Sequence, residues 1–202
     1  MIDSPPHGAQ VTKNPIRSLS KSTPRGALRL WDQPGFRKEG YVGKFGIAMI
    51  ISGGQTGADR GGLDAAMEWG IKIGGWAPNG YKAEDGRIPE KYAKAMLEHS
   101  GGYVKRTKAN VSDSDATLII SPSPLTSGSA LTMGFAAILK LPVVHVALEL
   151  SGKEQVEEIR RFLSRVHEQH PEPWVLNVAG PRESRRPGLQ QFVGKTLFEA
   201  LR

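Results

Sequence analysis

Short apolar segments, each closed by Gly, Ser or Pro, alternate along this chain with longer segments that carry a single apolar stripe at helical spacing. The short segments are predicted strands at residues 46–52, 71–76, 115–121, 143–148 and 174–179. Continuous apolar runs of this length are typical of parallel strands that are buried on both faces. Because strands and helices alternate, the sequence predicts an α/β fold built on a mostly parallel sheet.

The intervening segments predict five helices. The first follows a glycine-rich turn and ends at Gly70, the second begins at Pro89, and the third covers about residues 129–140. Ser151 and Glu154 form a capping-box pattern ahead of the fourth helix, and Pro187 opens the last one. We find no internal repeat of fixed period.

Residues 1–43 differ in composition from the rest. They contain five prolines among Ser, Arg and Gly and show no sustained apolar period. We interpret them as a basic extension without regular structure. The alternatives are a targeting segment and the product of a start codon assigned too early. We interpret residues 44–202 as one ligand-binding domain. Eight basic and three acidic residues precede Gly46, so most of the net charge of +7 lies there. The near-neutral remainder argues against nucleic-acid binding.

Two absences narrow the chemistry further. The chain has no cysteine, which excludes disulfides, thiolate metal sites and cysteine nucleophiles and favours a reducing, cytoplasmic setting. The longest apolar runs are shorter than a membrane-spanning helix requires. The five histidines have no metal-ligand spacing, so we expect no histidine metal site.

The first candidate binding turn joins a buried strand to a helix and reads Gly53, Gly54, Gln55, Thr56, Gly57, Ala58, Asp59. Glycines allow the backbone to approach a ligand closely, and the N–H groups at a helix N-terminus favour an anion. Neither the dinucleotide fingerprint nor the Walker pattern with its lysine is present. We therefore expect this turn to bind a phosphorylated small molecule. The alternative is a strand–helix turn that binds no ligand.

Two further turns should face the same crevice, because the carboxyl ends of parallel strands share one edge. One contains Gly128 and Ser129 and could contact the ligand. Alternatively, Ser127 or Ser129 only caps the helix that follows. The other contains Gly180, Arg182 and Ser184, followed by Arg185 and Arg186, which suggest a clamp for an oxyanion. Arg182 is the arginine that we expect to be least solvated.

The long loop after the second strand is harder to interpret. Trp76 could stack on a planar ligand ring or simply pack in the core. Glu84 and Asp85 could act in acid–base chemistry or hold a cation, but adjacent carboxylates in a loop are more often solvated. Asp113 and Asp115 precede a strand at the opposite edge and are expected to be structural.

These motifs carry a family resemblance. The segments 53–60, 74–76 with 83–86, 110–115, and 177–182 with Ser184 resemble, in the same order, the family named putative molybdenum carrier proteins. That family is the circularly permuted YpsA-like branch of the superfamily that contains the lysine-decarboxylase-like (LOG) proteins. The match runs from Met49 nearly to Arg202.

The resemblance implies a Rossmann-like three-layer fold and binding of the molybdenum cofactor (molybdopterin), without an established reaction. It also implies a homo-oligomer, with molybdoenzymes as partners that would receive the cofactor. One alternative is a sensor of a nucleotide-derived signal. Another is a LOG-type nucleoside monophosphate hydrolase, but Gly134 stands, after Thr132, where that class carries its catalytic glutamate, so we name no catalytic residue.

Overall fold

The structure is a computed structural model that describes residues 43–170 and 173–202. The basic extension predicted for residues 1–43 therefore lies outside the described residues, apart from Gly43 itself. Among the described residues, no helix is both long and apolar enough to cross a membrane.

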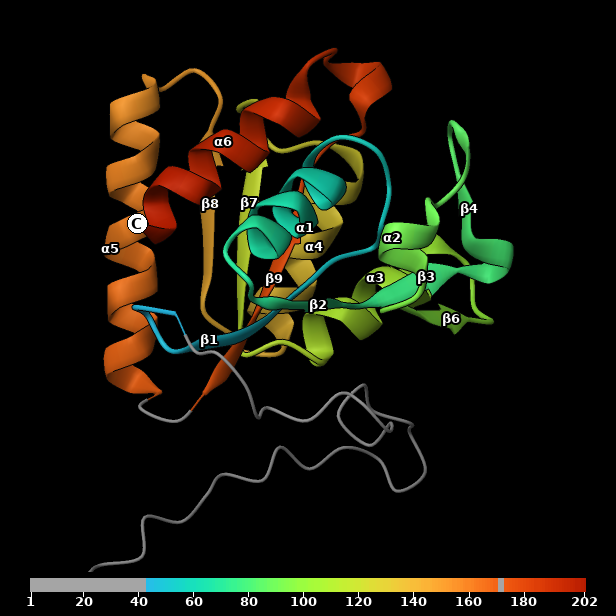
Figure 1. The fold of residues 1–202 in the computed structure, drawn as a ribbon, viewed down its shortest axis with the longest axis horizontal. Helices are drawn as coiled ribbons and strands as arrows, with labels where there is room; N and C mark the ends of the chain where they lie inside the picture. The colour runs from blue at the N-terminus through green and yellow to red at the C-terminus, as the bar shows by residue number, and fades with distance from the viewer. Residues whose placement is uncertain (1–42, 171–172) are drawn as a thin grey trace, which may run out of the picture.

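The centre of the fold is a parallel sheet of five strands (Figure 1). In spatial order these are β2 (Lys72–Gly74), β1 (Ile47–Ile51), β9 (Trp174–Ala179), β7 (Ala116–Ser121) and β8 (Val143–Ala147). The registers align apolar side chains across the sheet, with Ile50 between Ile73 and Leu176. All four strand pairs are parallel, so the predicted α/β fold is confirmed.

Helices cover both faces of this sheet. On one face, α1 (Ala58–Glu68), α5 (Gly152–Gln169) and α6 (Leu189–Leu201) pack over the main core, which includes Leu118, Phe162 and Leu197. On the other face lie α3 (Tyr103–Ser112) and α4 (Ser127–Ile138), which pack against each other. The predicted capping box opens α5: the Ser151 hydroxyl accepts from the Glu154 N–H, and the Glu154 carboxylate accepts from the Ser151 N–H.

The strand predicted at residues 71–76 is in fact two strands in different sheets. Gly75 separates them with a φ of +128°, and a β-carbon there would lie 2.0 Å from the Ser52 carbonyl oxygen. Only a glycine fits so close to the neighbouring strand. After it, β3 (Trp76–Pro78) leaves the main sheet and pairs in parallel with β6 (Leu97–His99).

The helix predicted to begin at Pro89 does form, but it ends much earlier than expected. The helix that begins after Pro89 has only four residues, α2 (Glu90–Ala93), and Leu97 already belongs to β6. Before it, a short 3₁₀ turn, η2 (Asn79–Tyr81), leads into the hairpin β4 (Lys82–Ala83) and β5 (Gly86–Arg87). The helix α3 was not predicted, because its inward face carries the polar Arg106 and Asn110 in place of an apolar stripe.

Candidate functional site

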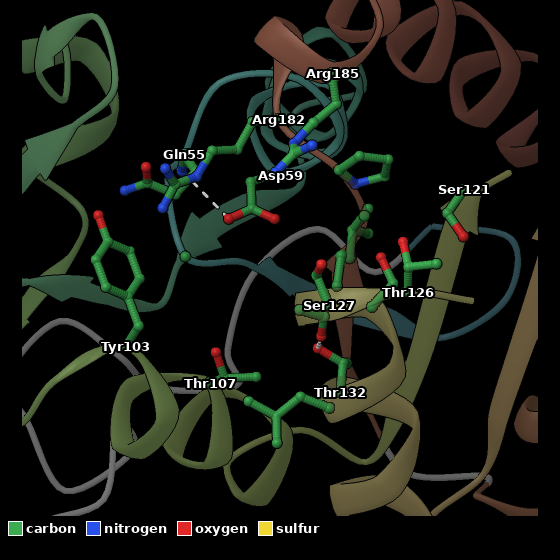
Figure 2. Close-up of a pocket in the computed structure, with 18 of the residues that line it drawn as sticks. Gln55, Asp59, Tyr103, Thr107, Ser121, Thr126, Ser127, Thr132, Arg182 and Arg185 are labelled. Atoms are coloured by element: carbon green, nitrogen blue, oxygen red, sulfur yellow. Dashed lines mark hydrogen bonds between the residues drawn. The ribbon is translucent and has the colours of Figure 1, made fainter.

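A cavity of about 600 Å³ lies where the carboxyl ends of β1, β9 and β7 meet (Figure 2). From β1 the chain continues into α1 and β2 toward one edge of the sheet, and from β7 it continues into α4 and β8 toward the other. Such a reversal of strand order is the place where ligands bind in open α/β sheets. The three turns singled out from the sequence do converge here, each contributing residues to the cavity wall.

Nine residues expected to bind the ligand line this cavity, and four do not. Those in the wall are Gly53, Gln55, Asp59, Gly128, Ser129, Thr132, Gly180, Arg182 and Ser184. Those outside it are Gly54, Thr56, Gly57 and Trp76. The difference follows from how each turn is built.

The turn after β1 is closed by the protein itself. The Asp59 carboxylate accepts the N–H of Gln55 at 3.2 Å, and the N–H of Gly53 also faces it. The N–H of Ala58, the first residue of α1, donates to the carbonyl oxygen of Pro181 at 3.1 Å. An internal carboxylate therefore occupies two N–H groups of the glycine-rich turn, and a carbonyl oxygen occupies the first N–H of the helix.

Burying the Asp59 carboxylate is unfavourable, because it removes the charge from water. Burial raises the pKa of its carboxyl above the ordinary value, and the nearby Arg106 guanidinium opposes that rise. Arg106 is itself desolvated, which lowers its pKa. Because Nη1 of Arg106 and Oδ2 of Asp59 are 3.8 Å apart, the two groups attract each other without forming a hydrogen bond.

The glycines of this turn are required by packing more than by ligand access. Gly57 has a φ of +79°, and a β-carbon there would lie 2.5 Å from the Pro181 carbonyl oxygen. At Gly54, also in the left-handed region, it would meet the side chains of Ile88 and Met96. Only at Gly53 does the glycine open toward the cavity, where the Arg106 guanidinium occupies the space of a side chain.

The turn after β7 is open. Thr126 is the N-cap of α4, but no side chain caps this helix. The first N–H groups of a helix have no partner within it, so those of Ser127 and Gly128 are available at the cavity wall. Ser127 has a φ of +48°, which is uncommon for a residue with a side chain and often marks a functional site. The Thr132 hydroxyl donates back to the Gly128 carbonyl oxygen at 2.9 Å.

The loop after β9 supplies positive charge. Gly180 packs tightly against β7, and Arg182 is partly buried, whereas Arg185 and Arg186 in and after the short turn η3 (Glu183–Arg185) are exposed. This agrees with the prediction that Arg182 is the least solvated of the three. With Arg106, the cavity wall contains four arginines against the carboxylates of Asp59 and Glu84. The wall therefore favours an anionic ligand.

Glu84 and Asp85 connect the hairpin β4–β5 to the turns beside the cavity. Glu84 accepts hydrogen bonds from the hydroxyls of Thr56 and Ser184. Burial alone would raise the pKa of Glu84, but these hydrogen bonds and Arg182 lower it overall. Asp85 forms a bidentate ion pair with Arg60, with distances of 2.6 and 2.9 Å, which lowers the pKa of Asp85. Both carboxylates are therefore committed to holding loops in place.

Trp76 packs in the core, which was the alternative to stacking on a ligand. It is 6% exposed, and its indole N–H donates to the Asp113 carboxylate at 2.7 Å. The expectation that it contacts the ligand is not supported, because Gly75 turns β3 away from the cavity before Trp76 is reached. Asp113 and Asp115 are structural, as predicted: Asp115 accepts the N–H of Val175.

Sequence reasoning missed the contribution of α3, which lines the cavity with Tyr103, Arg106, Thr107 and Asn110 (Figure 2). Arg106 is 8% exposed, and its Nε has no hydrogen-bond partner among the described residues. Buried polar groups are nearly always hydrogen-bonded, so the unpaired Nε makes Arg106 a candidate ligand contact in the cavity wall. The spacing of these four residues, at i, i+3, i+4 and i+7, was the signal that could have revealed them.

A serine and a histidine meet at the end of β7. Nε2 of His145 lies 3.0 Å from the Ser121 hydroxyl oxygen and 3.1 Å from the Ser121 carbonyl oxygen. The pair connects the end of β7 to the neighbouring strand β8.

Among the residues that the structure describes, no group of His, Cys, Asp and Glu is arranged to hold a metal ion. The cavity has an open helix N-terminus on one side and a mixed cluster of Arg106, Arg182 and Asp59 on the other.

Comparison with known proteins places this arrangement in a family. The model of the circularly permutated YpsA SLOG family matches residues 50–201. The chain is also similar to the crystal structure of a protein named "Putative molybdenum carrier protein" from Syntrophus aciditrophicus SB. The two share 43% sequence identity with a TM-score of 0.71, over 78% of this chain and 96% of that chain. No curated protein matches.

The family model and the solved structure agree with each other and with the described geometry. Both cover the domain that carries the three turns, and the fold is the Rossmann-like one that the sequence motifs implied. The chain belongs to the circularly permutated YpsA SLOG family.

Proposed function

We propose that this protein binds a phosphorylated small molecule in the cavity between α1, α3 and α4 and carries it without chemical change. The observation that supports this most directly is the uncapped N-terminus of α4, which opens into the same cavity as Arg182. A helix N-terminus and a guanidinium both bind phosphate oxygens, and together they make a site for a phosphomonoester.

The molybdenum cofactor is the member of this ligand class that the similarity to the Syntrophus protein favours. Its phosphate would bind the N–H groups of Ser127 and Gly128, and its pterin would lie toward α3. Because the chain has no cysteine, its contacts to the cofactor would be hydrogen bonds made by nitrogen and oxygen atoms. A molybdoenzyme would then be the receiving partner, and a homo-oligomer remains a prediction from the family.

The first test is calorimetric titration of the protein with ribose 5-phosphate, at low and at high salt. We expect binding that weakens as salt is added. Arg182→Ala should cost about 1.5–3 kcal/mol of binding free energy, because it removes a charge-assisted hydrogen bond. Arg161→Ala, an exposed position on α5, removes the same charge outside the cavity and should leave affinity unchanged.

Two results would contradict the proposal. Equal losses for Arg182→Ala and Arg161→Ala would mean that only the overall charge attracts the ligand. Release of free base from a nucleoside monophosphate would replace the carrier with the LOG-type hydrolase. Mass spectrometry of the purified protein distinguishes the carried molecules, since molybdopterin and a nucleotide differ in mass.

A further inference from the structure

The α3 side of the cavity contains three polar groups that the protein itself leaves incompletely paired. Arg106 and Asp59 have side chains that are each 10% exposed, yet their nearest charged atoms are 3.8 Å apart. Nε of Arg106 and Oε1 of Gln55 are buried and have no hydrogen-bond partner among the described residues. The Gln55 amide is fixed, because its Nε2 donates to the Lys82 carbonyl oxygen at 2.8 Å.

These groups have a definite chemical pattern. The Arg106 guanidinium can only donate, whereas the Asp59 carboxylate and the Gln55 Oε1 accept. Donor and acceptor groups in one cavity wall suit a ligand edge on which an acceptor is followed by donors. A phosphate group provides acceptors alone and would leave Asp59 facing like charge.

A planar heterocycle with a carbonyl oxygen, a ring N–H and an exocyclic amine presents that sequence of groups on one edge. Arginine is the usual partner of such a carbonyl oxygen, and carboxylates accept from ring N–H and amino groups. Tyr103 adds an aromatic surface at the mouth: it is 45% exposed, and the guanidinium carbons of Arg182 and Arg106 lie 5.0 and 5.5 Å from its ring centroid.

We propose that Arg106, Asp59 and Gln55 read the oxo-amino edge of a heterocycle, such as guanine or a pterin, and thereby select the ligand. Arg106 donates to the carbonyl oxygen, Asp59 accepts from the ring N–H and the amine, and Gln55 supplies the further acceptor. This inference rests on the proposed function, which assigns the phosphate to α4. One strand, β9, separates β1 from β7, so the two ends are roughly 10 Å apart at the usual strand spacing. A nucleotide-sized ligand spans that distance.

Four probes that differ only in the base test this selection by calorimetric titration. GMP carries the complete edge, IMP lacks the amine, AMP replaces the carbonyl with an amine, and ribose 5-phosphate has no base. We expect GMP to bind at least tenfold more tightly than AMP or ribose 5-phosphate, with IMP in between. Asp59→Asn should reduce the preference for GMP over AMP by tenfold or more and should not weaken ribose 5-phosphate binding.

Asp64→Asn is the matched control, since Asp64 lies on the same helix but outside this cavity. It should preserve the preference for GMP, and circular dichroism confirms that both variants fold. If ribose 5-phosphate binds but GMP and AMP bind equally, the inference fails while the proposed function stands. If no phosphorylated probe binds, the proposed function fails first. A uniform loss for all four probes in Asp59→Asn would give Asp59 a merely structural role.

Discussion

Two strand-to-helix turns border the cavity, and they are built in opposite ways. The turn after β1 is rich in glycine, yet the Asp59 carboxylate and the Pro181 carbonyl oxygen already accept its N–H groups. The turn after β7 has a less conspicuous sequence, yet α4 begins there without a side-chain cap. A glycine-rich turn therefore signals close packing as readily as ligand binding, and the free donors must be located in the structure.

The largest expected difference between the two turns is in the stability lost when a side chain is added to each. Gly57→Val places a β-branched residue at positive φ against the backbone of the β9–α6 loop. The left-handed backbone costs about 1–2 kcal/mol and the overlap a further 1–3 kcal/mol of unfolding free energy. Urea denaturation should show a loss of about 2–5 kcal/mol.

Gly128→Ala is the counterpart in the open turn. A β-carbon at Gly128 meets nothing within 4 Å, so the free energy of unfolding should change by less than about 0.5 kcal/mol. If both variants were equally stable, the turn after β1 would not be closed in the way we describe.

Asp59→Asn tests the internal carboxylate that closes the first turn. Burial raises the pKa of Asp59 in the folded state, so the ionised carboxylate lowers the stability of the fold at pH values above that pKa. This loss of stability disappears as the pH falls toward the pKa of an aspartate in the unfolded chain, about 4. Asp59→Asn should therefore be more stable than the parent at pH 7. Thermal unfolding between pH 4 and pH 8 should show this gain shrinking on acidification. A loss of stability at pH 7 would mean that the contacts of the carboxylate outweigh its burial.

Thr126→Asp makes the second turn resemble the first. A carboxylate at the N-cap of α4 should stabilise the protein by about 0.5–1 kcal/mol and occupy the free N–H groups. Binding of ribose 5-phosphate should then fall below detection by calorimetry. Thr126→Asn supplies a cap without charge and should weaken binding less. Unchanged binding in both variants would move the phosphate away from α4.

The sequence predicted most of the fold because the strands of a parallel sheet are continuous apolar runs. It failed where one glycine redirects the chain, at Gly75, and where a helix is held by polar contacts, in α3. Asn110 illustrates the second case: its side chain holds the backbone of Trp76 through hydrogen bonds of 2.8 and 3.1 Å. Such long-range pairing leaves no apolar period in the sequence.

The site was predictable to the extent that topology determines it. The sharing of one edge by parallel strands brought the turns containing Gly53, Ser129 and Arg182 together, as expected. The occupation of the glycine-rich turn by the Asp59 carboxylate was not predictable, because a local sequence does not show which way a carboxylate points. Arg106 was missed for the related reason that its charged partner, Asp59, lies on α1 and is distant in the sequence.

The position of β9 has a consequence for synthesis of the chain. It lies between β1 and β7, although among the described strands it is the last to be made. Until residues 174–179 have left the ribosome, β1 and β7 each expose an unpaired edge, and long-range pairing of this kind is slow and prone to aggregation. The wall of the cavity, to which β9 and the loop after it contribute, is therefore completed only after the other four strands of the sheet have been made.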